Sequence, residues 1–321
     1  MKAEAKHDIT MTCETCRVKC QRFGKHRNGL RRFRCPQCKK TYTEAHKPIL
    51  AGTYIPQDRI LLALRLLIEG NSIRSTERIT NLDRNTIMKM LTLAGEKCEK
   101  VMGRLIVNVP VKDVQCDEIW SFIQKKEKQC GPDDDPSFGD AYCFVAIERH
   151  SKLVLNCALG KRDQKTTDVF IEGLRHATAS QNFQITTDGF KPYKSAIDNT
   201  LSDHVDFAQL IKVYRASVEG EGRYSPAEVV STEVVPVVGT PDPKRICTSH
   251  IERQNLTMRM QIRRFTRLTN GFSKKFESHW AALALWFAFY NFCRIHSSIR
   301  VTPAMEAGIT DHVWELAELL A

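Results

Sequence analysis

Two Cys-x2-Cys pairs near the N-terminus constrain the fold of this chain more than any other feature. The first pair is Cys13 and Cys16, the second is Cys35 and Cys38, and eighteen residues separate the two pairs. Each pair lets two thiolates reach one ion, and four cysteines at this spacing are typical of a closed, tetrahedral structural zinc site. The intervening segment has β-ribbon character. Residues 1–50 are therefore predicted to form a zinc ribbon.

The ribbon is also strongly basic. Residues 1–50 contain thirteen Lys/Arg against four Asp/Glu, within a chain of formal net charge +11. Three arginines surround Phe33 in the middle of the ribbon, namely Arg31, Arg32 and Arg34. Such a surface suits the phosphates of nucleic acid, although a merely solvated face is the alternative. Cys20 is a spare thiol in this interpretation, and His26 is a weaker candidate ligand.

Nothing in the sequence indicates secretion or a membrane span. The N-terminus lacks the apolar run of a signal peptide, and the longest apolar stretch, Trp280–Tyr290, is too short to cross a bilayer. The helix that contains this stretch is apolar on nearly all sides, which predicts a buried core helix. The other eight cysteines show no pair-like spacing and are expected to be reduced. We expect a cytoplasmic, nucleoid-associated protein.

Residues 54–106 are predicted to form an all-α helix-turn-helix module. A first helix after Pro56 ends at Gly70, Ser72 caps a second helix, and Asp83 caps a third. In this motif the last helix enters the major groove of DNA with its N-terminal residues first. The residues predicted to contact DNA are Arg84, Asn85, Thr86 and Lys89. A small three-helix bundle without DNA binding is the alternative.

Residues 111–122, VKDVQCDEIWSF, set an acidic pair into an apolar, aromatic-rich run that predicts a central β-strand. Alternate side chains of a strand point to opposite faces, so Asp117 and Glu118 are expected on different faces. Only one of the two acids is then expected to face a given site. The alternative is an acid left in water at a strand edge, because ionised carboxylates are seldom buried unpaired.

The pattern of residues 110–300 is βββαβα. After the acidic strand the predicted elements are strands at 141–148 and 152–159, a helix at 164–176 and a strand at 182–186. Asp188 follows the last of these strands, at the carboxyl end where open α/β sheets bind ligands. Capping of the next helix is the alternative role for Asp188. The polar loop at 131–136 contains three aspartates and is expected to be solvated.

A Val-rich segment at 208–247 is predicted to be a β-hairpin insertion, and residues 248–270 have the periodicity of an amphipathic helix. Its apolar stripe consists of Ile251, Met258, Ile262 and Phe265. Its neighbouring polar face consists of Glu252, Arg259, Arg263 and Arg267. Ser249-x-x-Glu252 also fits a capping box, in which Glu252 would only satisfy a backbone N–H.

Asp117, Asp188 and Glu252 thus lie on three different elements of one predicted core. Three carboxylates that converge at a basic surface suit two Mg²⁺ or Mn²⁺ ions, which take oxygen ligands and keep positions open for phosphate and water. The arginines beside Glu252 would hold the DNA backbone there, since residues 253–300 contain nine Lys/Arg against one Asp/Glu. Glu118 adjoins Asp117 and is an alternative ligand if the strand twists.

Three blocks of this sequence resemble those of insertion-sequence-one family DDE transposases. They are DEIWSFIQKKEK, TTDGFKPY and HIERQNLTMRMQIRRFTRLTNGFSKKFESH. The resemblance covers nearly the whole chain, and RIHSSIRVTPAMEAG additionally resembles the end of many integrase-type catalytic domains. It implies an α/β fold of the RNase H-like class, with a mixed sheet flanked by helices over 110–300 and a helical tail over 301–321. It also implies Asp117, Asp188 and Glu252 as the catalytic triad.

By the same resemblance the chain would bind double-stranded DNA at the ends of a mobile element, as a homo-oligomer in the DNA complex. Metal-dependent hydrolysis would free 3′-hydroxyls there, which would then attack target DNA. Two other functions remain open at this point. One is a domesticated or inactive transposase that only represses as a DNA-binding protein, and the other is an RNase H-like nuclease without strand transfer.

Overall fold

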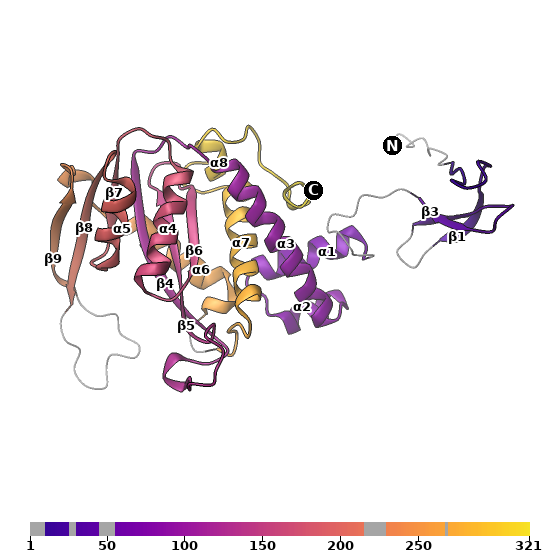
Figure 1. The fold of residues 1–321 in the computed structure, drawn as a ribbon, viewed down its shortest axis with the longest axis horizontal. Coiled ribbons are helices and arrows are strands. Elements are labelled where there is room, and N and C mark those ends of the chain that lie inside the picture. Colours follow the sequence, from indigo (N-terminus) through magenta and orange to yellow (C-terminus); the bar gives the residue numbers. More distant parts are fainter. Residues whose placement is uncertain (1–9, 26–29, 45–54, 215–228, 267–268) are drawn as a thin grey trace. The chain divides into compact units, whose positions relative to one another are not determined.

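The computed structural model describes residues 10–25, 30–44, 55–214, 229–266 and 269–321. His26 and Arg267, two candidates from the sequence, lie outside these residues. Contacts within the chain divide it into two compact units, residues 1–62 and 63–321. The division falls within α1 (Gln57–Ile68). The first unit contains a small sheet and the second a large one (Figure 1).

The small sheet is antiparallel and has three strands in chain order. They are β1 (Gln21–Lys25), β2 (Arg31–Arg34) and β3 (Thr41–Thr43). Phe33 at the centre of β2 is buried together with Cys13, Cys20 and Cys35. A core of this size buries too little apolar surface to hold a fold without a disulfide or a metal.

The large sheet has six strands in the order β6-β5-β4-β7-β8-β9. The strands are β4 (Asp113–Ile123), β5 (Gly139–Glu148), β6 (Val154–Gly160), β7 (Phe183–Thr187), β8 (Val205–Tyr214) and β9 (Val229–Val238). Strands β4 to β6 are antiparallel, β7 and β8 run parallel to β4, and β9 is antiparallel to β8. This mixed sheet, flanked by helices, fits the RNase H-like core that the resemblance implied.

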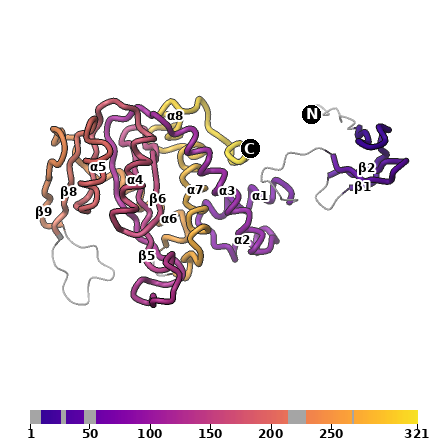
Figure 2. The backbone as a smooth tube through the Cα atoms, in the orientation of Figure 1, coloured from indigo at the N-terminus to yellow at the C-terminus, as the bar shows by residue number. Residues whose placement is uncertain are grey.

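The segment at 208–247 is built differently from the predicted insertion. Strands β8 and β9 do form a hairpin, and the backbone trace shows them side by side at one edge of the sheet (Figure 2). However, β8 also pairs in parallel with β7 from Phe183 to Thr187. The hairpin therefore extends the main sheet, and its first strand belongs to the core. Most described side chains of β9 are exposed.

Each face of the large sheet is covered by its own helices. On one face, rings from α4 (Gln164–Ala177) and α5 (Pro192–Leu201) meet Phe144 of β5: Phe170 lies 5.6 Å and Tyr193 6.4 Å from it. On the other face lie α6 (Ser249–Gln261) and α7 (Phe276–Phe292), and His279 of α7 contacts Ser121 of β4. Helix α7 is buried along most of its length, as predicted.

The helices before the large sheet include α2 (Ile73–Thr80) and α3 (Arg84–Leu105). Both predicted caps are present: the Ser72 hydroxyl accepts from the N–H of Ser75 at 3.0 Å, and Asp83 accepts from the N–H of Asn85 at 2.8 Å. Helix α3 packs against α7, where a Cβ at Gly95 would lie 2.4 Å from the Ala281 backbone. Only glycine permits this close approach.

The C-terminal tail is helical in part, as expected. Its helices are α8 (Pro303–Glu306) and α9 (Leu316–Leu319), and both pack on α7. Trp314, which precedes α9, lies 4.9 Å from the ring of Phe292 at the end of α7. In the described part of the chain, no helix is long and apolar enough to span a membrane.

The amphipathic helix predicted for 248–270 is shorter than the periodicity suggested. Helix α6 ends at Gln261, Ile262 is extended, and a 3-10 turn follows at Arg263–Phe265. The predicted apolar stripe is buried nevertheless, because the extended residue lets Ile262 and Phe265 both reach the core. Arg263 therefore does not share a helix face with Glu252.

Candidate functional site

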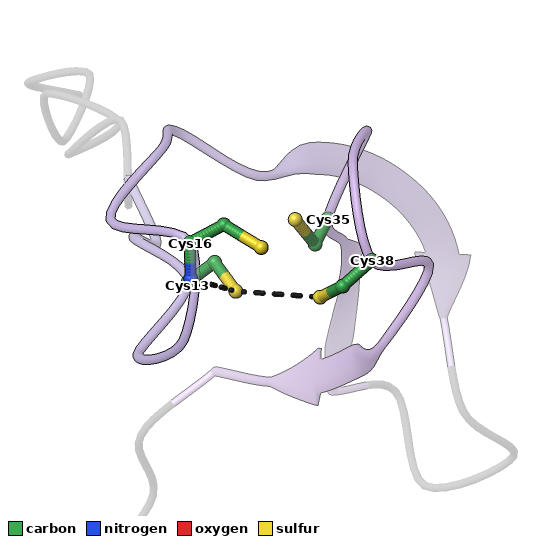
Figure 3. A group of neighbouring side chains, drawn as sticks. All are labelled: Cys13, Cys16, Cys35 and Cys38. Carbon is green, nitrogen blue, oxygen red and sulfur yellow. Dashed lines mark hydrogen bonds between the residues drawn. The ribbon is translucent and has the colours of Figure 1, made fainter.

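The four cysteines predicted to bind zinc come together at one end of the small sheet. Figure 3 shows their side chains pointing toward one another from two loops, and their sulfur atoms all lie within 4.8 Å of one another. The Sγ atoms of Cys13 and Cys38 are 3.6 Å apart. Cys20 is buried nearby but is not one of the group. The arrangement is that of four ligands around a single ion.

Hydrogen bonds favour the thiolate of Cys13, the form of cysteine that binds metal, whereas a hydrogen bond with Cys38 raises the pKa of Cys16 to about 12. The Tyr42 hydroxyl lies 3.1 Å from Cys13 Sγ and lowers the pKa of that thiol to about 6. The backbone N–H of Cys16 donates to the same sulfur at 3.4 Å.

On the outer surface of the small sheet, the guanidinium groups of Arg32 and Arg34 lie 5.3 and 5.0 Å from the ring of Phe23.

A second group of candidate ligands lines a pocket of about 640 Å³ in the large unit. The three acids predicted as the triad all line it: Asp117 from β4, Asp188 after β7, and Glu252 from the first turns of α6. They belong to three elements that are far apart in the chain. The charged or aromatic residues beside them are Arg162, Phe190, Lys191 and Lys212.

Asp117 is held on the face of β4 that α6 covers. Its Oδ2 accepts from the side-chain amide of Asn255 on α6 at 2.9 Å, and its Oδ1 accepts from the N–H of Glu118 at 2.8 Å. Burial, followed by the charges of Asp188 and Glu252, raises the pKa of Asp117 to about 6. The three carboxylates are thus close enough to repel one another, a repulsion that a cation would relieve.

Asp188 does not cap the following helix. The N-cap position of α5 is Lys191, and Asp188 instead accepts from the N–H of Phe190 at 2.9 Å. The pairing between β4 and β7 ends at Gln115 and Thr186. Asp188 therefore lies level with Asp117, just beyond the end of its own strand, where its carboxylate points into the pocket.

Glu252 does not form the alternative capping box either. The N-cap of α6 is Thr248 rather than Ser249, and the Thr248 hydroxyl donates to Glu252 Oε1 at 2.6 Å. The same oxygen is ion-paired with Lys212 of β8. The Glu252 carboxylate is thus engaged by side chains at the pocket wall and satisfies no backbone N–H at the helix start.

The expectation that only one acid of the Asp117–Glu118 pair would reach the site is wrong. The alternation itself holds, since Asp117 contacts α6 and Glu118 lies on the α4 and α5 face. However, carboxylate oxygens of Asp117, Glu118 and Asp188 all lie within 4.8 Å of one another. The reason is that Asp188 stands past the last paired residue of β7, where both faces of β4 are within its reach.

Sequence reasoning did not find the two basic side chains that contact these acids. Arg162 is 3.0 Å from Glu118 and 3.3 Å from Asp188, and Lys212 contacts Glu252. Arg162 comes from the residue before the N-cap of α4, and Lys212 comes from β8. No local motif marks either residue. Only the pairing of β7 with β8 and the entry into α4 bring them to the pocket.

The residues predicted to contact DNA differ in their exposure and in the elements that carry them. Arg84, Asn85 and Lys89 are exposed at the start of α3, and Thr86 is half-buried. Arg259 is half-buried on α6, and Arg263 lies in the 3-10 turn. Their role in DNA binding stays a prediction.

Comparison with known proteins finds a DDE domain family that matches residues 139–218. The match contains Asp188, whereas Asp117 and Glu252 lie outside it. Over these residues the match agrees with the resemblance to DDE transposases. No curated protein matches the chain.

Among solved structures, the chain is similar to a piggyBac transposase in a synaptic complex with hairpin DNA, determined by cryo-electron microscopy. The identity is 9%, the alignment covers 86% of this chain and 72% of that one, and the TM-score is 0.38. A TM-score this low does not establish a shared fold.

Proposed function

We propose that the chain is the transposase of an insertion sequence, a proposal supported by the match of residues 139–218 to a DDE domain family. It binds the ends of the element, cleaves the DNA there and joins the freed 3′-hydroxyls to target DNA. The observation that carries this proposal is the convergence of Asp117, Asp188 and Glu252 in one pocket. Three carboxylates without a compensating ion would destabilise one another, which is the signature of a cation site.

Asp117, Asp188 and Glu252 would hold two Mg²⁺ or Mn²⁺ ions, which supply Lewis acidity and an activated oxygen nucleophile when bound. The carboxylate oxygens fit these hard cations better than zinc, which prefers thiolate and imidazole ligands. Asn255 orients Asp117 through its amide, and Thr248 orients Glu252 through its hydroxyl. Both contacts keep the acids directed at the pocket.

The reaction consists of two phosphoryl transfers. In the first, a water oxygen bonds to the phosphorus at the element end, the bond from phosphorus to the 3′-oxygen breaks, and a 3′-hydroxyl is left. In the second, that 3′-oxygen bonds to a phosphorus of the target strand, whose own bond to a 3′-oxygen breaks. Lys191 at the pocket rim is placed to bind the DNA backbone during both steps.

The remaining parts of the chain serve DNA binding in this proposal. One structural zinc ion held by Cys13, Cys16, Cys35 and Cys38 maintains the N-terminal sheet and its arginines. The first turn of α3 enters the major groove. Two element ends must be brought together for transposition, so we propose that the protein assembles as a homo-oligomer on DNA.

The test is a reaction of the purified full chain with Mg²⁺, a duplex that carries the element end found beside its gene, and a supercoiled target plasmid. We expect a free 3′-hydroxyl at the element end and products in which it is joined to the plasmid. Cleavage without joining would show a nuclease instead. Binding without any cleavage would show a repressor. Asp188→Asn serves as the inactive control.

A further inference from the structure

We propose that Arg162 binds a DNA phosphate in the acidic pocket and that Glu118 is its positioning residue and not a metal ligand. The inference rests on the proposed function, because the phosphate belongs to the strand being cut. It also assigns a role to the fourth acid of the site, which the chemistry of Asp117, Asp188 and Glu252 does not use.

The guanidinium of Arg162 is held from three sides. Its Nε donates to Glu118 Oε2 at 3.0 Å, one terminal nitrogen donates to Asp188 Oδ2 at 3.3 Å, and its carbon lies 4.0 Å from the ring centre of Phe190. Two ion pairs and a stacked ring fix both the position and the plane of the group.

Arg162 nevertheless keeps a free side toward the pocket. Its side chain is 37% exposed, and its Nη1 donates to none of the residues that the structure describes. A planar guanidinium with open donors matches the oxygens of a phosphate, which it can bind in a bidentate manner. The backbone beneath it is also fixed, because Asp163 caps α4 by accepting from the N–H of Thr166 at 2.9 Å.

Glu118 has the surroundings of an anchor. Its side chain is only 2% exposed, whereas those of Asp188 and Glu252 are 39% and 47% exposed. One of its oxygens accepts from Arg162, the other is buried, and the Tyr193 hydroxyl is a further hydrogen-bond partner of the carboxyl group. The side chain lies against Tyr193 on the α4 and α5 face, away from Glu252.

These contacts explain why the two residues belong together. A buried carboxyl group stays ionised only when a cation pairs with it and otherwise takes up a proton, so the charge of Glu118 depends on Arg162. Conversely, the ion pair draws the guanidinium to the pocket wall beside Asp188, where the scissile phosphate must lie. Glu118 therefore acts on the DNA through Arg162, while Asp117, Asp188 and Glu252 remain the oxygen ligands.

Two measurements on full-length variants separate this arrangement from one in which Glu118 binds metal. The first is the salt dependence of binding to the element-end duplex in EDTA. Arg162→Met should reduce the slope of log K against log salt by about 0.9, the loss of one phosphate contact. Lys161→Met is the matched control, because Lys161 is paired with Glu127 at 2.8 Å and does not line the pocket, so its slope should equal the parent's.

The second measurement is the Mn²⁺ affinity of the free protein by calorimetry. Glu118→Gln should bind Mn²⁺ within about twofold of the parent, whereas Asp188→Asn should bind at least about tenfold more weakly. Glu118→Gln keeps a side-chain oxygen that can accept from the Arg162 Nε. Thermal unfolding checks that each variant is folded, and Arg162→Gln replaces Arg162→Met if the latter is not.

If Arg162→Met shows the same slope of log K against log salt as the parent, the proposed contact between Arg162 and a phosphate is wrong. A loss of Mn²⁺ affinity in Glu118→Gln equal to that in Asp188→Asn would make Glu118 a metal ligand. Neither measurement needs DNA cleavage. If the parent protein does not cleave, the proposed function fails, while the slope and the affinity still decide the roles of Arg162 and Glu118.

Discussion

The cysteine cluster and the acidic pocket are both sets of metal-ligand side chains, yet they are built in opposite ways. The cysteines come from two short turns, and the core of the sheet that carries them has four buried side chains among the residues that the structure describes. The acids come from β4, the end of β7 and the start of α6, and they are supported by a large core of strands and helices. In the first region the ligands form the core, and in the second the core positions the ligands.

This difference predicts what a metal does in each region. The small sheet cannot hold its shape without the cross-link that four thiolates provide, so metal binding and folding are one event there. The large sheet is folded whether or not its acids bind a cation, because apolar side chains such as Phe144, Phe170 and Trp286 are fully buried. Loss of a metal ligand should therefore unfold the small sheet. In the large unit it should abolish DNA cleavage and leave the fold intact.

The largest expected effect follows loss of one cysteine. Cys35→Ser should lose zinc and unfold the N-terminal sheet, because structural zinc sites contribute about 10–16 kcal/mol of apparent binding free energy. Elemental analysis should find one zinc per parent chain and none in the variant. Limited proteolysis should then cut within residues 1–50 and leave 63–321 intact. Cys20→Ser is the matched control and should keep its zinc. Full zinc occupancy in Cys35→Ser would refute the assignment of the ligands.

The acidic pocket should respond to ligand loss in the opposite way. Glu252→Gln keeps the size of the side chain and removes its charge, so folding and DNA binding should survive while cleavage falls by about three orders of magnitude or more. Asp117→Asn and Asp188→Asn should behave alike. Gel assays of end cleavage, together with thermal unfolding, measure both properties. Cleavage by Glu252→Gln at a rate near the parent's would show that Glu252 is not in the catalytic site.

The core of the large unit has its own sensitivity to pH. Burial lowers the pKa of His279 to about 3, and its ring contacts Ser121 and Ser273. The unfolded chain takes up this proton below pH 6.5 and the folded chain does not, so the free energy of unfolding falls as the pH drops from 6.5 to 3.

The change is about 1.4 kcal/mol per pH unit for this one group. Urea unfolding of the parent and of His279→Asn, followed by tryptophan fluorescence between pH 7 and pH 5, isolates it. The difference in unfolding free energy between the two proteins should shrink by that amount per unit, and contributions of Asp117 and Glu118 cancel in the comparison. A constant difference across this range would show that His279 takes up its proton at the same pH in the folded and the unfolded chain.

The smallest expected effect concerns the binding of DNA by α3. This helix contains neither of the two sets of metal-ligand side chains. Arg84→Gln and Lys89→Gln should each reduce the slope of log K against log salt by about 0.9 and leave folding unchanged, because both side chains are exposed. Arg104→Gln, exposed at the far end of the same helix, should keep the parental slope. Parental slopes in Arg84→Gln and Lys89→Gln would count against the helix-turn-helix interpretation.

Much of the fold was predictable because its signals are local. The caps at Ser72 and Asp83, the strands around 141–148 and 182–186, and the buried α7 all follow from turn chemistry and apolar periodicity. The periodicity predicted too long a helix at 248–270, because the buried apolar stripe continues beyond the end of α6. Residues Ile262 and Phe265 keep the predicted stripe buried after α6 has ended, because an extended residue and a 3-10 turn can reach the same core.

The sequence by itself determined the cysteine cluster, since two residues separate the ligands within each turn and the two turns are close to one another in the chain. It also identified Asp117, Asp188 and Glu252 as candidates, through their positions on a strand, a strand end and a helix start. The tertiary structure alone decided what surrounds them. The end of β4–β7 pairing brings Glu118 to Asp188, and the entry into α4 brings Arg162 to both. These contacts depend on sheet register and helix packing, which residues far apart in the chain determine jointly and no local pattern records.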